Sequence, residues 1–238
     1  MLPSIFQACL PRLEIEQGEL SVELFAAELR SVLEHTAPQV YQNADLFFGN
    51  TYPTDGMKTL LSEVFSRLSN RSAGSPVIRL ETSFCGGKTH NEIALWHICK
   101  KGVAIQNLEH FISLDLIPTQ SIQVTAIDGR DLDPKNGVFH QDTGITTYTP
   151  WGEIAYQLGG VDNYDLLRGS DIKGISPVPG LLERLIKDRP TLIALDKIAR
   201  YLRAAKAKTI ENSDLAKQVV AFLFTLMVGS PESYSYIP

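Results

Sequence analysis

A glycine-centred loop carries the residues whose chemistry is most specific in this chain. It reads Thr82-Ser83-Phe84-Cys85-Gly86-Gly87-Lys88-Thr89-His90, and its end matches the G-K-[ST] half of a Walker A, or P-loop, motif. In such loops backbone N–H groups wrap the phosphates, the lysine reaches the terminal phosphates, and the hydroxyl ligates Mg²⁺. Thr82 stands where the general pattern has its first glycine. We predict a nucleotide-binding segment over residues 82–90, with Lys88 on the β- and γ-phosphates.

The neighbours of this loop suit a phosphate site. A short apolar run, Val77-Ile78-Arg79-Leu80, precedes it, and a helical pattern extends from Lys88 to Lys101. A phosphate loop leaves a strand and delivers the anion to a helix N-terminus, where unpaired N–H groups and the helix dipole favour negative charge. Taken by itself, the loop could also be a glycine-rich turn with a surface lysine.

A second segment resembles a Walker B element. The run Thr191-Leu192-Ile193-Ala194-Leu195-Asp196 is apolar without alternation, as expected for a parallel strand buried on both faces, and a carboxylate closes it. Such an aspartate holds Mg²⁺ beside the phosphate loop. The alternative is that Asp196 only caps the helix that follows. Because both segments occur in one chain, we favour a nucleotide site with Thr89 and Asp196 as the Mg²⁺ ligands.

Composition sets the class of protein. The chain has 238 residues, 44% hydrophobic and 21% charged, with a formal net charge of −5. These values predict a globular protein and show no overall basic excess for nucleic acid. Cys9, Cys85 and Cys99 lack any metal-ligand spacing, so we expect free thiols. The longest apolar run, residues 219–228, is about half of a membrane span, and Met1–Arg12 lacks the charged start and apolar centre of a signal peptide. We expect a cytoplasmic protein.

The spacing of apolar residues, together with capping residues, glycine and proline, predicts the helices and strands that would position these residues. Residues 128–148 form a turn-rich acidic stretch whose carboxylates do not fit a calcium loop, and we expect solvated turns there. Trp151 is expected in the core. We divide the chain into an N-terminal helical segment, residues 1–74, and a nucleotide-binding core, residues 75–238. The predicted helices cover residues 21–35, 57–68, 88–101, 149–160, 181–187, 198–206 and 213–228, and the predicted strands cover 77–80, 122–127 and 191–196.

Four stretches together resemble a large bacterial and archaeal family of predicted AAA+-superfamily ATPases. This family is catalogued as a domain of unknown function and is often encoded beside DNA methylases in restriction or anti-phage islands. The resemblance covers most of the chain and rests on Tyr52–Gly56, Arg79–His90, Pro150–Gly160 and Leu195–Leu202. It implies an α/β fold, the three-layer P-loop NTPase sandwich with a mostly parallel sheet, preceded by the helical segment. It also implies ATP and Mg²⁺ as ligands, and Thr82 is usual at its position in this family.

Two positions depart from that family pattern. Cys85 stands where the family usually has a third glycine, which places a thiol in the phosphate cradle. Lys197 follows Asp196, where an acidic residue is expected to polarise the attacking water. A lysine, whose reference pKa is about 10.4, cannot accept that proton at neutral pH. Glu81 or Glu153 could replace the acidic residue, but their spacing places neither one in the site. We therefore expect binding with little hydrolysis.

Family members are longer than this chain, which resembles their N-terminal part. In the family sheet, a strand that carries a polar sensor residue lies between the loop strand and the Walker B strand. We expect this strand to be missing and the core to be incomplete unless residues 234–237 supply it, because two buried strands would otherwise leave unpaired backbone groups.

Three functions remain open at this point. The first is a Mg²⁺–ATP-binding P-loop protein, for which the resemblance implies ATPase activity. The second is a non-catalytic interaction module of a DNA-modification or phage-defence complex, with protein partners. The third is direct DNA binding through four basic residues, which we instead expect to form a solvated helix face because the whole chain is acidic. These four residues are Arg200, Arg203, Lys206 and Lys208.

Overall fold

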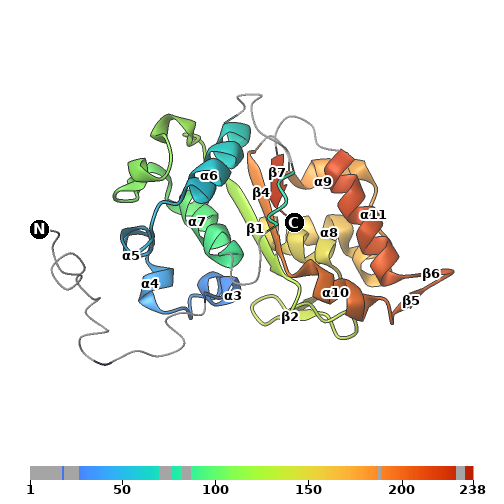
Figure 1. Ribbon diagram of the computed structural model, residues 1–238. Helices are drawn as coiled ribbons and strands as arrows, with labels where there is room; N and C mark the ends of the chain where they lie inside the picture. Colours follow the sequence, from blue (N-terminus) through green and yellow to red (C-terminus); the bar gives the residue numbers. More distant parts are fainter. Residues whose placement is uncertain are drawn as a thin grey trace, which may run out of the picture.

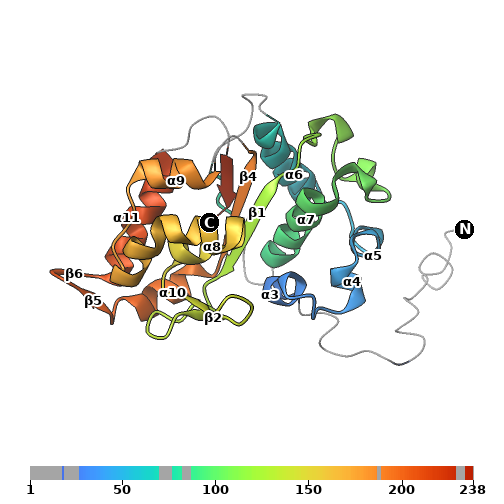
Figure 2. The same cartoon turned by 180° about the vertical axis from the view of Figure 1, so that it is seen from behind.

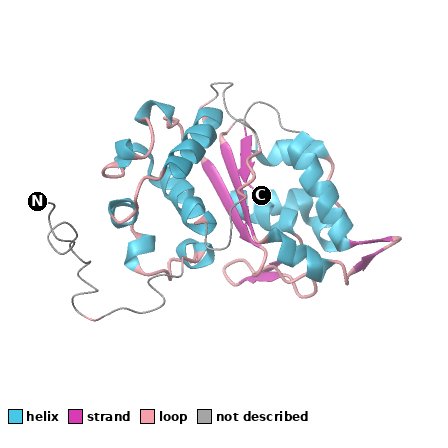
Figure 3. Cartoon of the chain, in the orientation of Figure 1, coloured by secondary structure: helices cyan, strands magenta, loops and turns pink. Residues whose placement is uncertain are grey.

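The computed structural model describes residue 18 and residues 27–69, 77–81, 87–186, 189–228 and 234–237. Most of the predicted phosphate loop, residues 82–86, lies outside these ranges, as do Cys9, Cys85 and the first part of the helix predicted over residues 21–35. Within the described residues, the protein is a mixed α/β fold with helices on both faces of a small parallel sheet (Figures 1 and 3).

Three parallel strands form the sheet in the described part of the chain. They are β1 (Gln123–Asp128), β4 (Thr191–Asp196) and β7 (Tyr234–Ile237), in the spatial order β1-β4-β7. The register pairs each residue of β1 with its counterpart in β4, so that Asp128 lies opposite Asp196 at the carboxyl ends of the two strands. The sheet therefore brings two carboxylates together at one edge.

The helices that precede the sheet in sequence cover one of its faces. They are α3 (Leu29–Leu33), α4 (Gln39–Gln42), α5 (Ala44–Gly49), α6 (Asp55–Leu68) and α7 (Lys88–Lys101). The short 3-10 helices η2 (Gly102–Ala104), η3 (Leu108–His110) and η4 (Leu114–Leu116) follow. Thr54 caps α6 by accepting the backbone N–H of Met57 at 3.2 Å. Gly102 ends α7 at a φ of 58°, which glycine adopts without steric cost.

The later helices cover the opposite face (Figure 2). They are α8 (Pro150–Lys173), α9 (Pro179–Ile186), α10 (Ile198–Ala205) and α11 (Leu215–Val228). Two small antiparallel hairpins accompany them: β2 (Val138–His140) with β3 (Ile145–Thr147), and β5 (Thr209–Ile210) with β6 (Ser213–Asp214). Thr149 caps α8, whose first residue is Pro150, as the sequence predicts.

Strand β4 separates two hydrophobic cores. Leu192 and Ala194 belong to the core under α6 and α7, whereas Ile193 and Leu195 belong to the core under α8, α10 and α11. Because successive side chains of a strand point to opposite faces, both faces of β4 are buried, and this explains its apolar run without alternation. Trp151 is completely buried in the second core, as predicted.

The elements predicted most accurately are long and have clear start and stop signals in the sequence. Helix α7 begins and ends at the predicted residues, β4 has the predicted bounds, and α6, α10 and α11 differ from prediction by two residues or fewer at either end. The helix predicted over 181–187 is α9, which begins two residues earlier at Pro179.

The strand predicted over Val77–Leu80 is wrong as a regular strand. Only Val77 forms a β-bridge, and residues 78–81 have no assigned secondary structure. Arg79 and Glu81 are largely exposed and form an ion pair at 2.8 Å. An apolar run becomes a strand only where a neighbour pairs with it along its length, and here that pairing is confined to one residue.

One further prediction is corrected in the acidic stretch. Residues 128–148 are not only solvated turns, because β2 and β3 form a hairpin within them. The helix predicted to end at Gly159-Gly160 does break there, because both glycines have non-helical backbone angles. A second helical segment under the same label α8, which was not predicted, continues to Lys173 and buries Tyr164 and Leu167.

Residues 234–237 supply a strand beside β4. Strand β7 pairs in parallel with β4 over four residue pairs, from Thr191–Tyr234 to Ala194–Ile237. The segment 77–81 runs next to β7 in both views of the ribbon (Figures 1 and 2). The gap that the sequence leaves open on that side of β4 is therefore filled. No helix in the described part of the chain is long and apolar enough to cross a membrane.

The first testable prediction concerns the packing of α8. A methyl group at Gly152 would overlap the carboxylate of Asp171, which is fully buried and accepts hydrogen bonds from the Thr149 hydroxyl and the Tyr164 hydroxyl. Displacing a buried acceptor from its donors costs about 1–3 kcal/mol. We expect Gly152→Ala to lower the free energy of unfolding, measured by urea denaturation, by about this amount.

The control is Gly169→Ala in the same helix. A methyl group at Gly169 would meet no atom within 4 Å. Alanine in an open helical position stabilises by about 0.5–1 kcal/mol relative to glycine, so this variant should be more stable than the parent chain. Equal effects of the two substitutions would contradict the packing described for Asp171.

Candidate functional site

The N-terminus of α7 has the backbone geometry that the sequence predicts. Gly87 precedes the helix with a φ of 71°, in the left-handed region that favours glycine. Its carbonyl accepts hydrogen bonds from the backbone N–H of Asn91, at 3.0 Å, and from the Asn91 side chain, at 3.1 Å. The first N–H groups of α7 follow directly at Lys88 and Thr89, and helix N-termini of this kind attract anions.

A hydrogen bond joins the two predicted metal-binding residues. The Thr89 hydroxyl, on the first turn of α7, donates to Asp196 Oδ2 at 3.2 Å across 107 positions of sequence. Asp196 is 7% exposed and lies at the carboxyl end of β4. The end of the loop motif and the end of the apolar strand therefore meet in space, as we predicted from their types.

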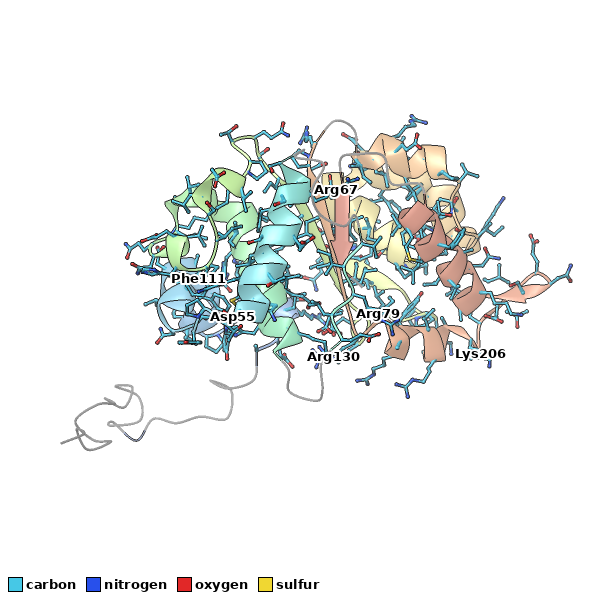
Figure 4. All side chains as sticks on the ribbon, turned by 45° about the horizontal axis from the view of Figure 1, so that its top comes forward. Asp55, Arg67, Arg79, Phe111, Arg130 and Lys206 are labelled. Atoms are coloured by element: carbon cyan, nitrogen blue, oxygen red, sulfur yellow. The ribbon has the colours of Figure 1, made fainter. Side chains whose placement is uncertain are left out.

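A second carboxylate, Asp128, stands beside Asp196 and was not predicted. Arg130 donates to both of its oxygens: Nε lies 3.2 Å from Oδ1 and 3.0 Å from Oδ2, and Nη2 lies 2.7 Å from Oδ2. Burial alone would raise the pKa of Asp128, but the hydrogen bonds from Arg130 and Lys197 outweigh it and lower this pKa. Asp128 is therefore ionised at neutral pH. Arg130 also lies 3.5 Å from Glu28, and it marks this end of the sheet in Figure 4.

Lys197 bridges the two carboxylates. Its Nζ donates to Asp128 Oδ2 at 3.1 Å and also contacts Asp196 Oδ2. Burial alone would lower the pKa of Lys197, but these two hydrogen bonds outweigh it and raise this pKa, so the side chain is an ammonium. The cation stands at the position for which the sequence resemblance led us to expect a carboxylate.

The backbone of Lys197 is unusual. Its φ is 53°, in the left-handed region that non-glycine residues seldom occupy. A side chain at Gly129 would clash with the Lys197 carbonyl oxygen at 2.5 Å, and the Gly129 N–H donates to the Asp196 carbonyl at 2.8 Å. Glycine at position 129 thus lets the ends of β1 and β4 approach closely enough to share the cation.

Glu92 is a further site residue that the sequence analysis missed. It is 3% exposed, on α7, and its Oε2 has no hydrogen-bond partner within the described residues. Burial, together with the nearby charge of Asp196, raises the pKa of Glu92 to about 8. Helical spacing could have found it, because residue i+3 from Thr89 lies on the same face of the helix.

His90 faces a different part of the molecule. Its Nε2 lies 2.9 Å from the Thr51 hydroxyl, and its ring centroid lies 4.5 Å from that of Phe47 on α5. These contacts hold α7 against α5. The predicted nucleotide contacts at residues 82–86 lie outside the described residues, so that the structure describes Gly87, Lys88, Thr89 and His90 of the predicted segment.

The two carboxylates considered as substitutes for an acid at position 197 do not contact Asp196. Glu81 is largely exposed and pairs with Arg79. Glu153, on α8, accepts from the Thr147 hydroxyl at 2.6 Å and from Gln157 Nε2 at 2.9 Å, and it lies 3.0 Å from His140 Nε2. Its hydrogen bonds commit it to the β2–β3 hairpin.

A cavity of about 530 Å³ lies on the outer side of β1. Its lining includes Trp96, Asp128, His140, Tyr156 and Gln157. Its polar side chains bind one another or the sheet: Gln157 Oε1 accepts the backbone N–H of Ala126 at 3.0 Å, and the His140 and Tyr156 rings stack with centroids 3.7 Å apart. We call Asp128 and Asp196, with Arg130 and Lys197, the carboxylate cluster. Of these four residues, Asp128 alone lines the cavity.

The predicted Mg²⁺ ligands, Thr89 and Asp196, lie beside a lysine ammonium. In the part of the chain that the structure describes, no group of three or more His, Cys, Asp or Glu residues could hold a metal ion. Thr89 and Asp196 have suitable oxygens and lie together, but Asp196 is also bound by the Lys197 ammonium. A Mg²⁺ ion requires several oxygen ligands at about 2.1 Å, and a fixed ammonium on one of them opposes it.

The four basic residues near α10 differ in their exposure and contacts. Arg200, Arg203 and Lys206 are exposed, in keeping with a solvated helix face. Lys208 instead donates to the Pro134 carbonyl at 2.8 Å and lies over the Tyr148 ring, so it ties the acidic stretch to the end of α10.

The second testable prediction concerns Glu92. Its pKa is raised from 4.5 to about 8 in the folded protein, so the folded state keeps a proton that the unfolded chain releases between these pH values. The free energy of unfolding should therefore fall as pH rises through this window, by up to about 1.4 kcal/mol per pH unit. Glu92→Gln cannot ionise, so it should flatten this fall in urea denaturation series.

The matched control is Glu63→Gln, on the exposed side of α6. This variant should keep the pH dependence of the parent chain, because it removes an exposed carboxylate and leaves Glu92 in place. If Glu92→Gln and Glu63→Gln show the same slope as the parent chain, Glu92 is not the group that holds the extra proton.

Comparison with known protein families places this chain in one of them. No match was found among curated proteins or among solved structures. The family model described as the DUF499 N-terminal domain matches residues 19–230, which include α3 to α11, β1 and β4 with the carboxylate cluster at their ends. The match spans most of the chain, and the protein therefore belongs to the DUF499 family through its N-terminal domain.

Proposed function

We propose that this chain is a nucleotide-binding domain that holds the phosphates of a nucleoside triphosphate at the N-terminus of α7. The observation that carries the proposal is the hydrogen bond from Thr89 to Asp196. The loop motif and the apolar strand were identified independently in sequence, and a phosphate site requires them to be neighbours. A turn with a surface lysine and a separate capping aspartate would have no reason to meet.

The placement of α7 supports the same function. Ligands of open parallel sheets bind outside the carboxyl ends of the strands, and the ends of β1 and β4 lie at the first turn of α7. Gly87, in its left-handed conformation, lets the chain enter the helix with the first N–H groups directed outward. Lys88 then supplies a positive charge at the same helix end.

The sheet supports a P-loop NTPase sandwich of the AAA+ type. In that architecture a strand lies between the loop strand and the Walker B strand, and β7 lies between the segment 77–81 and β4 (Figure 1). Helices cover both faces of the sheet, which makes three layers. ATP is the nucleotide that the family resemblance implies.

Hydrolysis should be slow. General bases and water-orienting groups contribute a factor of about 10² to 10⁴ in rate. Lys197 cannot serve, and Glu81 and Glu153 are committed elsewhere. Glu92, with its pKa raised to about 8, keeps its proton at neutral pH. The nucleotide would then act chiefly as a bound ligand, which is compatible with a non-catalytic module of a DNA-modification or phage-defence complex.

The third testable prediction uses thermal stability. A ligand that binds only the folded state raises the melting temperature by mass action. Millimolar ATP or ADP should therefore raise the Tm of the parent chain, and Lys88→Ala should abolish the shift because the lysine charge on the phosphates is lost. The measurement is differential scanning fluorimetry or calorimetry with increasing nucleotide.

Lys58→Ala is the matched control, since Lys58 is exposed on α6. It should keep the full shift of the parent chain. Absence of a shift in the parent chain, or equal shifts in Lys88→Ala and Lys58→Ala, would refute nucleotide binding at α7.

A further inference from the structure

We propose that the ammonium of Lys197 replaces the divalent metal ion of this site, so that nucleotide binds with little dependence on Mg²⁺. The inference rests on the proposed nucleotide site and specifies its cation. It follows because the residues present do not match the ligands that a dedicated metal centre needs.

The first step is the position of the ammonium. Lys197 Nζ donates to Asp128 Oδ2 at 3.1 Å and contacts Asp196 Oδ2, the same oxygen that accepts the Thr89 hydroxyl. These are the oxygens that a divalent ion would need. A metal ion and the ammonium cannot both occupy the space between the two carboxylates.

The second step is the charge of the cluster. The carboxylates of Asp128 and Asp196 share the Lys197 ammonium, and Arg130 adds a second cation that pairs with Asp128 and lies 3.5 Å from Glu28. A divalent ion placed between Asp128 and Asp196 would add two positive charges beside these two cations, at a place where both carboxylates are buried.

The third step is the backbone at position 197. A non-glycine residue in the left-handed region costs about 1–2 kcal/mol and persists only where its surroundings determine it. Here the close approach of Gly129 to the Lys197 carbonyl and the two ion pairs determine it. The lysine is thus held at the strand end, with its charge directed back over the carboxylates.

The fourth step is what the ammonium can offer a phosphate. An ammonium has three donors, and two of them bind Asp128 and Asp196 in the described part of the chain. The Lys197 side chain is 35% exposed, so its remaining donor can meet a ligand oxygen. With Lys88 at the helix end, the site supplies two lysine charges to the phosphates and does not require a metal bridge.

The fourth testable prediction compares nucleotide affinity with and without metal. ATP binding to the full chain is measured by calorimetry in EDTA and in millimolar MgCl₂. The parent chain should bind with dissociation constants that agree within about threefold in the two conditions. Lys197→Met, which removes the charge and keeps the length of the side chain, should bind at least about tenfold more weakly in EDTA than in MgCl₂.

A control and a second variant separate charge from folding. Lys206→Met changes an exposed lysine at the end of α10, well away from Arg130 in Figure 4, and should behave as the parent chain does. Lys197→Arg keeps a cation and should keep the metal independence. Circular dichroism and urea denaturation of each variant report whether it is folded.

A second measurement uses the metal alone. Without nucleotide, millimolar MnCl₂ should leave the melting temperature of the parent chain and of Lys206→Met unchanged. It should raise that of Lys197→Met, because Asp128 and Asp196 then face each other without a cation between them. This arm does not need the nucleotide site to exist.

The outcomes are distinct. A parent chain that binds ATP at least about tenfold better with Mg²⁺ than in EDTA overturns the inference while sustaining the proposed function. A parent chain that binds no nucleotide in either condition refutes the proposed function, and the manganese arm then decides the role of Lys197. The lysine does not replace a metal if the melting temperature of folded Lys197→Met fails to rise with Mn²⁺. The same conclusion holds if Lys197→Met fails to fold and the melting temperature of Lys197→Arg rises with Mn²⁺.

Discussion

The in-register pairing of β1 with β4 is the constraint on which the rest of the site depends. Both strands are buried on both faces, and both end on an aspartate, so their register places Asp128 and Asp196 side by side. Neighbouring carboxylates repel each other when both carry charge, and a cation between them removes this repulsion. Arg130 and Lys197 supply cations at this edge from positions within two residues of each strand end.

Sequence alone was sufficient for the elements whose signals are local. The unbroken apolar run of β4 and the capped, well-bounded pattern of α7 predict those elements at their observed ends. Sequence alone was insufficient for elements whose structure depends on a pairing strand or on packing against the core. Val77 forms only a bridge because a strand needs a neighbour along its length. The helical segment after the break at Gly159 and Gly160 was missed, and burial of Tyr164 and Leu167 packs it against the core.

The same distinction applies to the site. Thr89 and Asp196 were predicted together because each belongs to a motif with a known mechanism. Asp128 and Arg130 carry no such motif, and only the register of β1 against β4 shows that they belong to the site. Assigning Glu92 to the site required knowing which face of α7 carries Thr89. The unusual backbone of Lys197 has no sequence signal, since lysine seldom adopts positive φ.

Membership in the DUF499 family and an α/β fold do not determine what the site does, because chemistry depends on individual side chains placed on a fold. A carboxylate at position 197 would stand beside Asp196 as a second anion, would draw in a divalent ion and could orient water. The lysine found there pairs with both Asp128 and Asp196. In the proposed nucleotide site this cation would take the place of the metal ion and leave no base for hydrolysis. One charge reversal at the end of β4 would then turn a site suited to turnover into one that retains its ligand, without altering the core that positions it.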